Sequence, residues 1–268
     1  MLMSAEGVTL RLQDYGEDDR MLTILTREQG VVYAYARGAR RMKSKKDNAA
    51  MALGVYSKFI LFKNKERYNI DGAESIQLFY GLRQDLVKLS MASYFCELMA
   101  FHAPQGEKAE EFLRLLLNGL YLVEKGQKSP FLVKAAFELR LMAMAGYMPN
   151  LVGCASCGEY ASDSPGFSLD LLQGTLLCSR CRAEEAAQLE EPESYASACR
   201  EQLLPDGVLA AMRHILYADF EKLFRFQLGG ENLRRLGQVS EAFLLAQTER
   251  NYNTLDFLKD ILPSGENT

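Results

Sequence analysis

The sequence predicts an α+β fold class, and three observations support that prediction. In the first 80 residues, short apolar stretches alternate with turn-forming residues, which is typical of β-strands. From Leu82 onward, apolar residues recur every three to four positions, which is the period of a helix. Two Cys-x-x-Cys pairs then interrupt the helical part. We therefore expect an N-terminal β-barrel followed by an α-helical domain that carries an inserted four-cysteine module.

The N-terminal part contains several candidate strands, separated by turn-forming residues. The apolar or alternating stretches are residues 8–12, 21–26, 31–35, 55–63, 68–70 and 73–77. About five strands with no helix between them, within some 70 residues, predict a small closed or half-closed barrel. The OB-fold is the commonest small barrel of this kind, and an SH3-like barrel is the alternative.

A strongly basic segment, residues 37–46, lies between the third and fourth of these strands, and we call it the basic loop. Six of its ten residues are cationic and none is acidic. Each cation on such a loop can neutralise a phosphate, and Gly38 lets the backbone approach a ligand closely. The loop therefore predicts nucleic-acid contact, and a solubilising loop is the alternative. The candidate DNA-binding residues are Arg37, Gly38, Arg40, Arg41, Lys43, Lys45 and Lys46.

The charge of the chain is unevenly distributed. The formal net charge is −4, but residues 1–70 hold 13 Lys and Arg against 8 Asp and Glu. The remaining residues hold 18 against 27, so they are acidic. Because binding responds to the local field within a Debye length of about 8–10 Å, the basic N-terminal part is where we expect a polyanion to bind.

Aromatic residues are interleaved along the predicted strands. They are Tyr33, Tyr35, Tyr56, Phe59, Phe62 and Tyr68. Side chains alternate between the two faces of a strand, so we expect about half of these rings to pack in the barrel core. The others could stack on nucleic-acid bases.

The helical part divides at glycine and proline residues. We predict helices over residues 82–101, 112–126 and 130–146, and further helical pieces over 208–226, 239–250 and 255–262. Pro130 suits the first turn of the third helix. The apolar stripes are expected to form a bundle core. A partner groove is the alternative, with Lys134 and Arg140 at its edge.

The two Cys-x-x-Cys pairs predict a structural Zn²⁺ site. Cys154 and Cys157 form one pair, and Cys178 and Cys181 form the other about 20 residues later. Four thiolates with this spacing suit tetrahedral Zn²⁺, and they leave no open position for catalysis. Gly158 supplies the positive φ that such a knuckle uses. Two disulfides or a redox-active Cys-x-x-Cys are the alternatives.

The sequence also bears on reaction class and location. It contains no phosphate-binding loop, dinucleotide-binding glycine motif, His-Glu-x-x-His or Gly-x-Ser-x-Gly elbow, so we predict that it is not an enzyme. His102 and His214 lie on apolar helical stretches and are expected to be structural. There is no signal-like start and no apolar run long enough to cross a bilayer, which predicts a cytoplasmic protein.

Taken in this order, the motifs resemble those of the bacterial RecO recombination mediators. They are the run Arg37-Gly38-Ala39-Arg40-Arg41, the helical stretch from Phe137 to Tyr147, the cysteine insert, and the closing stretch Thr254-Leu255-Asp256-Phe257-Leu258. The resemblance implies an OB-fold DNA-binding domain at 1–80, a helical domain at 81–150 and 183–268, and a zinc-binding module at 151–182. It also implies that the four cysteines are the zinc ligands of the members that retain a metal.

The resemblance further implies a function and partners. Members bind single- and double-stranded DNA and anneal complementary strands, without being enzymes. With RecR they help load RecA onto DNA coated with single-strand-binding protein, and some bind the acidic tail of that protein through the helical domain. This implies a cytoplasmic, nucleoid-associated protein. The alternative function is a non-catalytic adaptor with a structural zinc module, in which the basic loop fits an acidic protein.

Overall fold

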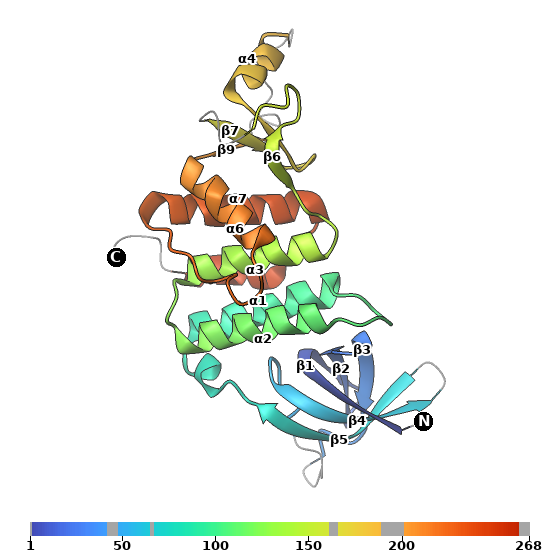
Figure 1. Ribbon diagram of the computed structural model, residues 1–268. Coiled ribbons are helices and arrows are strands. Elements are labelled where there is room, and N and C mark those ends of the chain that lie inside the picture. The colour runs from blue at the N-terminus through green and yellow to red at the C-terminus, as the bar shows by residue number, and fades with distance from the viewer. Residues whose placement is uncertain (1, 42–47, 65–66, 161–165, 189–200, 263–268) are drawn as a thin grey trace. The chain divides into compact units, whose positions relative to one another are not determined.

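The computed structural model describes residues 2–41, 48–64, 67–160, 166–188 and 201–262. It divides into two compact units (Figure 1). Unit 1 comprises residues 1–128 and 252–268, and unit 2 comprises residues 129–251. The predicted fold class is confirmed, because a closed barrel precedes helices and the four cysteines lie together within the helical part.

The barrel of unit 1 has five strands. They are β1 (Leu2–Tyr15), β2 (Asp19–Thr26), β3 (Gly30–Ala36), β4 (Tyr56–Asn64) and β5 (Arg67–Gln77). Their order is β1-β2-β3-β5-β4, and β4 pairs with β1 to close the barrel. Only the β3–β5 pairing is parallel among these strand pairs. This closed five-stranded topology is that of an OB-fold, so the half-closed alternative does not apply.

The two predicted strands at 68–70 and 73–77 are one strand, β5. Its register against β4 shifts between Ile60 and Leu61, which pair with Gly72 and Ile70, so Asp71 is an extra residue. A bulge of this kind interrupts the alternation of side chains without ending the strand. The sequence pattern therefore shows a break where the backbone continues.

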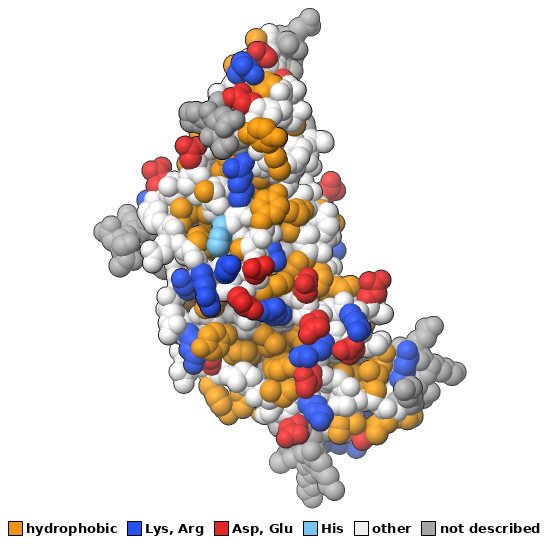
Figure 2. Space-filling model, viewed as in Figure 1, with side chains coloured by type: hydrophobic (Ala, Val, Ile, Leu, Met, Phe, Trp, Pro, Cys, Tyr) orange, Lys and Arg blue, Asp and Glu red, His pale blue; other side chains and the backbone are white. Residues whose placement is uncertain are grey.

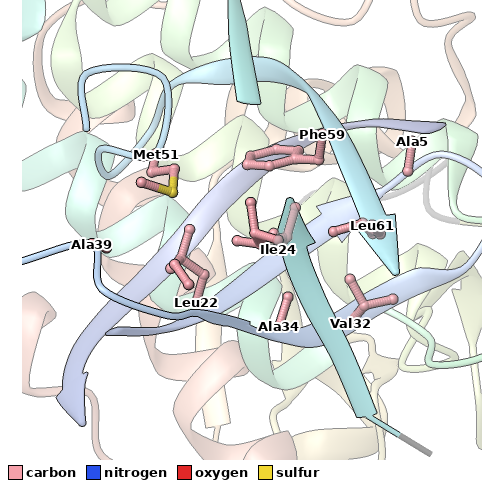
Figure 3. Close-up of a cluster of buried hydrophobic side chains, with 11 residues drawn as sticks. Ala5, Leu22, Ile24, Val32, Ala34, Ala39, Met51, Phe59 and Leu61 are labelled. Atoms are coloured by element: carbon pink, nitrogen blue, oxygen red, sulfur yellow. The ribbon is translucent and has the colours of Figure 1, made fainter. Parts of the chain in front are cut away.

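The barrel core is filled by small, branched and aromatic side chains from all five strands (Figure 3). They include Leu22 and Ile24 of β2, Val32 of β3, Phe59 of β4 and Ile70 of β5. Two further members, Ala39 and Met51, come from the connection between β3 and β4. The connection that carries the basic loop is thus anchored in the core at both of these residues.

Helices complete unit 1. They are η1 (Tyr80–Gln84), α1 (Leu86–His102), α2 (Glu110–Lys125) and α8 (Asn253–Ile261). The helix predicted from residue 82 begins instead at Leu86, because the Asp85 side chain accepts a hydrogen bond from the Lys88 N–H and caps it. The C-terminal helix α8 packs against α1. There the Tyr252 hydroxyl lies 2.7 Å from His102 Nε2, in agreement with a structural role for this histidine.

Unit 2 consists of a helical part and a small sheet. Its long helices are α3 (Pro130–Met144), α6 (Asp206–Tyr217) and α7 (Gly230–Thr248). The sheet has the order β6 (Asn150–Cys154), β8 (Thr175–Leu177), β7 (Phe167–Asp170), β9 (Glu201–Leu204), and α4 (Ser179–Gln188) follows β8. The helix predicted over 208–226 is wrong beyond Tyr217, because Ala218 is extended and the apolar residues that follow pack as turns.

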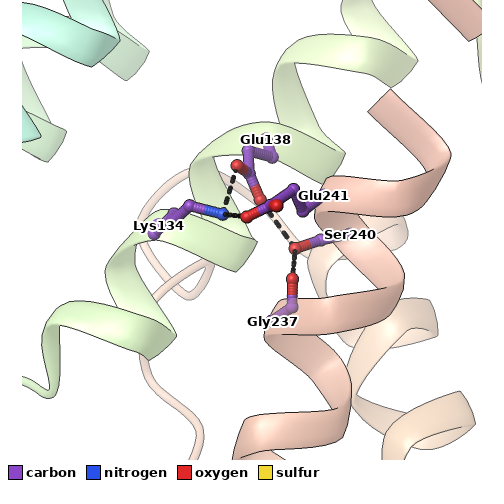
Figure 4. A network of polar contacts seen from close by, with 5 residues as sticks. All are labelled: Lys134, Glu138, Gly237, Ser240 and Glu241. Atoms are coloured by element: carbon purple, nitrogen blue, oxygen red, sulfur yellow. Dashed lines mark hydrogen bonds and ion pairs between the residues drawn. The ribbon is translucent and has the colours of Figure 1, made fainter. Parts of the chain in front are cut away.

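The side chains of Lys134 and Arg140 bind other residues of unit 2, so they do not line the edge of a groove. Lys134 is 4% exposed and lies within 2.7 Å of Glu138 and 2.8 Å of Glu241 (Figure 4). Arg140 donates to the carbonyls of Ile215 and Leu216 at the end of α6. Among the described residues, no helix is long and apolar enough to cross a membrane.

Candidate functional site

The basic loop begins with a tight turn whose backbone is fixed and whose cations point outward. The Ala39 N–H donates to the Ala36 carbonyl at 3.4 Å, and Gly38 has a φ of +65°. Ala39 has no exposed surface and packs into the barrel core (Figure 3). Arg37, Arg40 and Arg41 on either side of it are exposed. The start of the loop is therefore a rigid platform for three guanidinium groups.

An acidic turn, residues 14–19 between β1 and β2, contacts this platform. Its backbone and side chains hold the loop: Gly38 N–H donates to Asp19 Oδ1 at 2.7 Å, and Arg40 N–H donates to the Asp18 carbonyl at 2.9 Å. Two ion pairs add to this, with Arg41 Nε 2.9 Å from Asp18 Oδ2 and Arg40 Nε 3.6 Å from Asp14 Oδ2.

These ion pairs were missed from the sequence, although a signal for them exists. Strands β1, β2 and β3 are antiparallel neighbours, so the turn after β1 and the end of β3 lie at the same end of the barrel. Antiparallel pairing of consecutive strands would therefore bring the acidic run at 14–19 near the basic run at 37–46, but the structure alone shows which residues pair. The predicted DNA-binding residues Lys43, Lys45 and Lys46 lie outside the described residues.

Two aromatic rings, one exposed and one partly buried, lie on the strand ends next to the acidic turn and the platform. The rings of Tyr15 and Tyr35 meet edge to face with centroids 5.3 Å apart, and Tyr15 is 55% exposed. The Arg67 guanidinium lies 6.0 Å from the centre of the Tyr35 ring. Sequence reasoning missed Tyr15, because it sits among Asp and Gly residues of a turn.

The six rings interleaved along the predicted strands divide between core and surface. Phe59 is fully buried in the barrel core, while Tyr33 and Phe62 are almost half exposed. The other three rings are partly buried. On the face drawn in Figure 2, basic and acidic side chains lie interspersed among hydrophobic ones.

The four predicted metal ligands converge in unit 2. The Sγ atoms of Cys154, Cys157, Cys178 and Cys181 all lie within 4.8 Å of one another. The parallel pairing of β6 with β8 sets Cys154 opposite Leu176 and so brings the two pairs together. Cys157 Sγ and Cys178 Sγ are 3.8 Å apart. This matches the edge of a tetrahedron with metal–sulfur bonds of about 2.3 Å, so the cluster can hold a metal ion.

Backbone groups around the cysteines favour thiolates. Cys178 N–H donates to Cys154 Sγ at 3.4 Å, and Cys181 N–H donates to Cys178 Sγ at 3.5 Å. Burial raises the pKa of Cys154, but N–H groups at Cys157, Cys178 and Ser156 lower it more, to about 6. A hydrogen bond with Ser156 lowers the pKa of Cys181, but burial and the three neighbouring thiols raise it to about 12. The four sulfurs thus influence one another's ionisation, and a cation bound among them would favour their thiolate forms.

The helices of unit 2 hold the cysteine-bearing segment by its backbone. Arg213 of α6 donates through Nε to the Leu151 carbonyl at 2.8 Å, and its Nη2 also reaches the Val152 carbonyl. Gln247 of α7 donates to the carbonyls of Leu171 and Leu172. Gly158, after the second cysteine, has a φ of +74° and donates to the Cys154 carbonyl. These contacts fix the backbone on which the four cysteines converge.

Comparison with known proteins gives matches over nearly the whole chain. Residues 1–79 match the family described as Recombination protein O N terminal, and residues 83–256 match Recombination protein O C terminal. A protein of Acetivibrio thermocellus is 32% identical over 97% of this chain and 97% of its own length. Proteins of Alkaliphilus metalliredigens and Symbiobacterium thermophilum are each 31% identical, over 97% and 96% of this chain and 100% and 96% of their own lengths.

All three relatives bear the name DNA repair protein RecO. The resemblance noted from the basic loop, the helical stretch and the cysteine insert is thereby confirmed over both units. With both terminal families matched in order and full-length relatives above 30% identity, the chain belongs to the recombination protein O (RecO) family.

Proposed function

We propose that this protein is a non-enzymatic DNA-repair mediator that binds single- and double-stranded DNA at the end of the barrel bearing the basic loop. The observation that carries the proposal is the platform of Arg37, Arg40 and Arg41, exposed on a turn that Ala39 anchors in the barrel core. Guanidinium groups held on a rigid turn can bind successive phosphates without reading base sequence.

Two further features support DNA binding at this end of the barrel. Lys43, Lys45 and Lys46 follow the platform in sequence and extend its positive charge. Tyr15 and Tyr35 lie at the ends of strands that lead into the acidic turn and the platform, where an unpaired base could stack on the exposed Tyr15 ring. Phosphate binding and stacking together would hold two strands long enough to anneal.

The proposed partners follow from family membership. The protein would anneal complementary strands and, with RecR, help load RecA onto DNA coated with single-strand-binding protein, whose acidic tail would bind the helical part. These roles place it in the cytoplasm at the nucleoid. We also propose that the four cysteines bind one structural Zn²⁺, because their spacing and convergence fit a closed tetrahedral site.

The test is the binding of a labelled, unstructured single-stranded DNA, followed by fluorescence anisotropy across a salt series. Six cations engaging single-stranded phosphates predict a slope of log K against log salt of about −4. The variant with Arg37, Arg40, Arg41 and Lys43 changed to Ala should reduce that slope to about −1. A positive result would justify annealing assays with complementary strands.

A matched control removes four exposed cations from helices and loops outside the barrel, by changing Lys108, Lys125, Lys222 and Arg250 to Ala. Its slope should stay near that of the wild type. Failure of the wild type to bind at low salt, or equal binding by the wild type and the loop variant, would favour the adaptor alternative.

A further inference from the structure

Carboxylates of the acidic turn form ion pairs with Arg40 and Arg41, which the proposed function assigns to DNA binding. Asp18 Oδ2 lies 2.9 Å from Arg41 Nε, and Asp14 Oδ2 lies 3.6 Å from Arg40 Nε. Arg20 also reaches Asp14, at 3.3 Å. All these side chains are at least 31% exposed, so an incoming ligand can reach them.

The described charges at this end of the barrel nearly balance. The turn contributes four carboxylates, those of Asp14, Glu17, Asp18 and Asp19. Arg20 and Arg40 pair with Asp14, and Arg41 pairs with Asp18. Arg37 is exposed on the same turn as Arg40, and Arg67 lies over the Tyr35 ring. A phosphate that approaches the platform therefore meets a local field weaker than the cation count alone suggests.

A carboxylate and a phosphate oxygen interact with a guanidinium in the same way. Both accept charge-assisted hydrogen bonds from the planar N–H groups of arginine. An aspartate held at Arg41 thus offers the contact that a phosphate would make, and the phosphate has to displace it or share the group. Exposed ion pairs are weak, so displacement by a polyanion is feasible.

We propose that Asp14 and Asp18 are intramolecular competitors for phosphate at Arg40 and Arg41, and that they set the DNA affinity of the barrel. This inference rests on the proposed function. The competitors lower affinity by a fixed factor and favour ligands that present several phosphates in a row. Asp19 has a different role, because its carboxylate accepts from the Gly38 N–H and holds the loop in place.

The test compares the wild type with the variant D14N/D18N, which keeps the size of both side chains and leaves Asp19 unchanged. The control D71N/E74Q removes two exposed charges from β5 of the same barrel. Anisotropy titrations with single-stranded DNA at low salt should show D14N/D18N binding roughly two- to tenfold tighter than the wild type. The control should change affinity less, because it alters only the overall charge.

A double-mutant cycle identifies the arginine through which Asp18 acts. Asp18→Asn should tighten binding in the wild type and have no effect beyond that of the charge control when Arg41 is already Ala. An equal gain in both backgrounds, unchanged binding, or weaker binding by D14N/D18N would overturn the proposal. Weaker binding would mean that the aspartates orient the arginines for DNA.

Inorganic polyphosphate as a second ligand separates this proposal from the proposed function. If polyphosphate binds D14N/D18N more tightly while DNA binds neither protein, the competition stands and the DNA-binding proposal fails. If DNA binds the wild type and the substitutions leave both ligands unaffected, the competition fails and DNA binding stands. If neither ligand binds any variant, both proposals fail.

Discussion

Ala39 shows how a single residue inside the basic loop can matter through its burial. Ala39 lies between Gly38 and Arg40 in the chain, and its side chain packs among Leu22, Ile24 and Met51 in the barrel core. Its neighbours in the chain present cations to solvent, while Ala39 fixes the direction in which they point. A cation added at the buried position 39 is therefore expected to have the opposite effect on DNA binding from a cation at the exposed neighbouring positions.

We predict that Ala39→Arg weakens DNA binding although it adds a cation. A guanidinium at position 39 would be buried in the apolar barrel core and would overfill it. This should lower the free energy of unfolding by roughly 3 kcal/mol or more. The control Ser4→Arg adds the same charge at an exposed position of β1 and should change stability by no more than about 0.5 kcal/mol. Urea denaturation and anisotropy measure both effects, and tighter binding by Ala39→Arg would contradict the assigned orientation.

Lys134 is a buried cation stabilised by two acidic neighbours. Burial alone lowers its pKa, but the charges and hydrogen bonds of Glu138 and Glu241 together outweigh burial and raise the pKa above its usual value. Ser240 completes the network by donating to Glu138 at 2.6 Å (Figure 4). The cluster joins α3 to α7, so it specifies how these helices pack.

Lys134→Ala should destabilise unit 2 by about 3–5 kcal/mol, because it leaves two glutamates near each other without a cation. A raised pKa means that the contribution of Lys134 is fully present below the unfolded-state pKa of about 10.4 and is lost as the pH rises through the higher folded-state pKa. The loss measured by urea denaturation should therefore be constant between about pH 7 and 9.

The exposed Lys222→Ala is the control in the same unit and should cost less than about 1 kcal/mol. The triple change of Lys134 to Met and of both glutamates to Gln should restore much of the stability, because no buried charge is left unpaired. A loss for Lys134→Ala no larger than that of the control would contradict this account.

At the scale of elements, the cysteine cluster organises the short sheet of unit 2. Strands of three to five residues form little hydrogen bonding of their own, so their arrangement depends on the helices that hold them and on the sulfur cluster. The four clustered cysteines lie near the two ends of the connection between β6 and α4. We expect the metal to be needed for this local structure.

The purified protein should contain about one Zn²⁺ per chain by elemental analysis, and Cys154→Ser should abolish this content. Cys96→Ala is the control, because Cys96 is buried in α1 of unit 1 and outside the cluster. Burial raises the pKa of Cys96 to about 12, whereas Cys157 is exposed and the pKa of Cys154 is lowered to about 6. Iodoacetamide at neutral pH should therefore modify Cys154 and Cys157 after chelation and leave Cys96 unmodified. Metal retained by Cys154→Ser would refute the assigned ligands.

At the scale of the whole molecule, the N-terminal and C-terminal parts of the chain belong to the same compact unit. The chain leaves unit 1 at Lys128, forms unit 2, and returns at Tyr252. On its return, Tyr252 is 1% exposed and bonds to His102, and the N–H of Thr254 donates to Glu97 of α1. The C-terminal helix is thus part of the compact unit that contains the barrel.

We expect Tyr252→Ala to cost about 3–5 kcal/mol, because it removes a large buried ring that packs against Tyr94 and Phe101. Hydrogen exchange should then increase in α1 and α8 and remain unchanged in α7. The half-exposed Phe257→Ala on the same helix is the control, with a loss of about 0.5 kcal/mol. Equal exchange in both variants would contradict the packing of α8 on α1.

Much of the fold and of both candidate sites could be predicted from the sequence by itself. The barrel followed from the alternation of apolar residues, the metal cluster from the spacing of Cys154, Cys157, Cys178 and Cys181, and the exposed arginines from the composition of the basic loop. These features depend on residues close together in the chain, so short-range patterns encode them.

Only the tertiary structure decided which distant residues meet. Asp18 reaches Arg41 across 23 positions, Lys134 reaches Glu241 across 107, and Tyr252 reaches His102 across 150. The local sequence pattern alone suggested an exposed cation at Arg41, the edge of a groove at Lys134 and an apolar helix stripe at His102. The physical reason is that the free energy of a charged or aromatic side chain depends on its burial and on its partner, and packing between segments sets both.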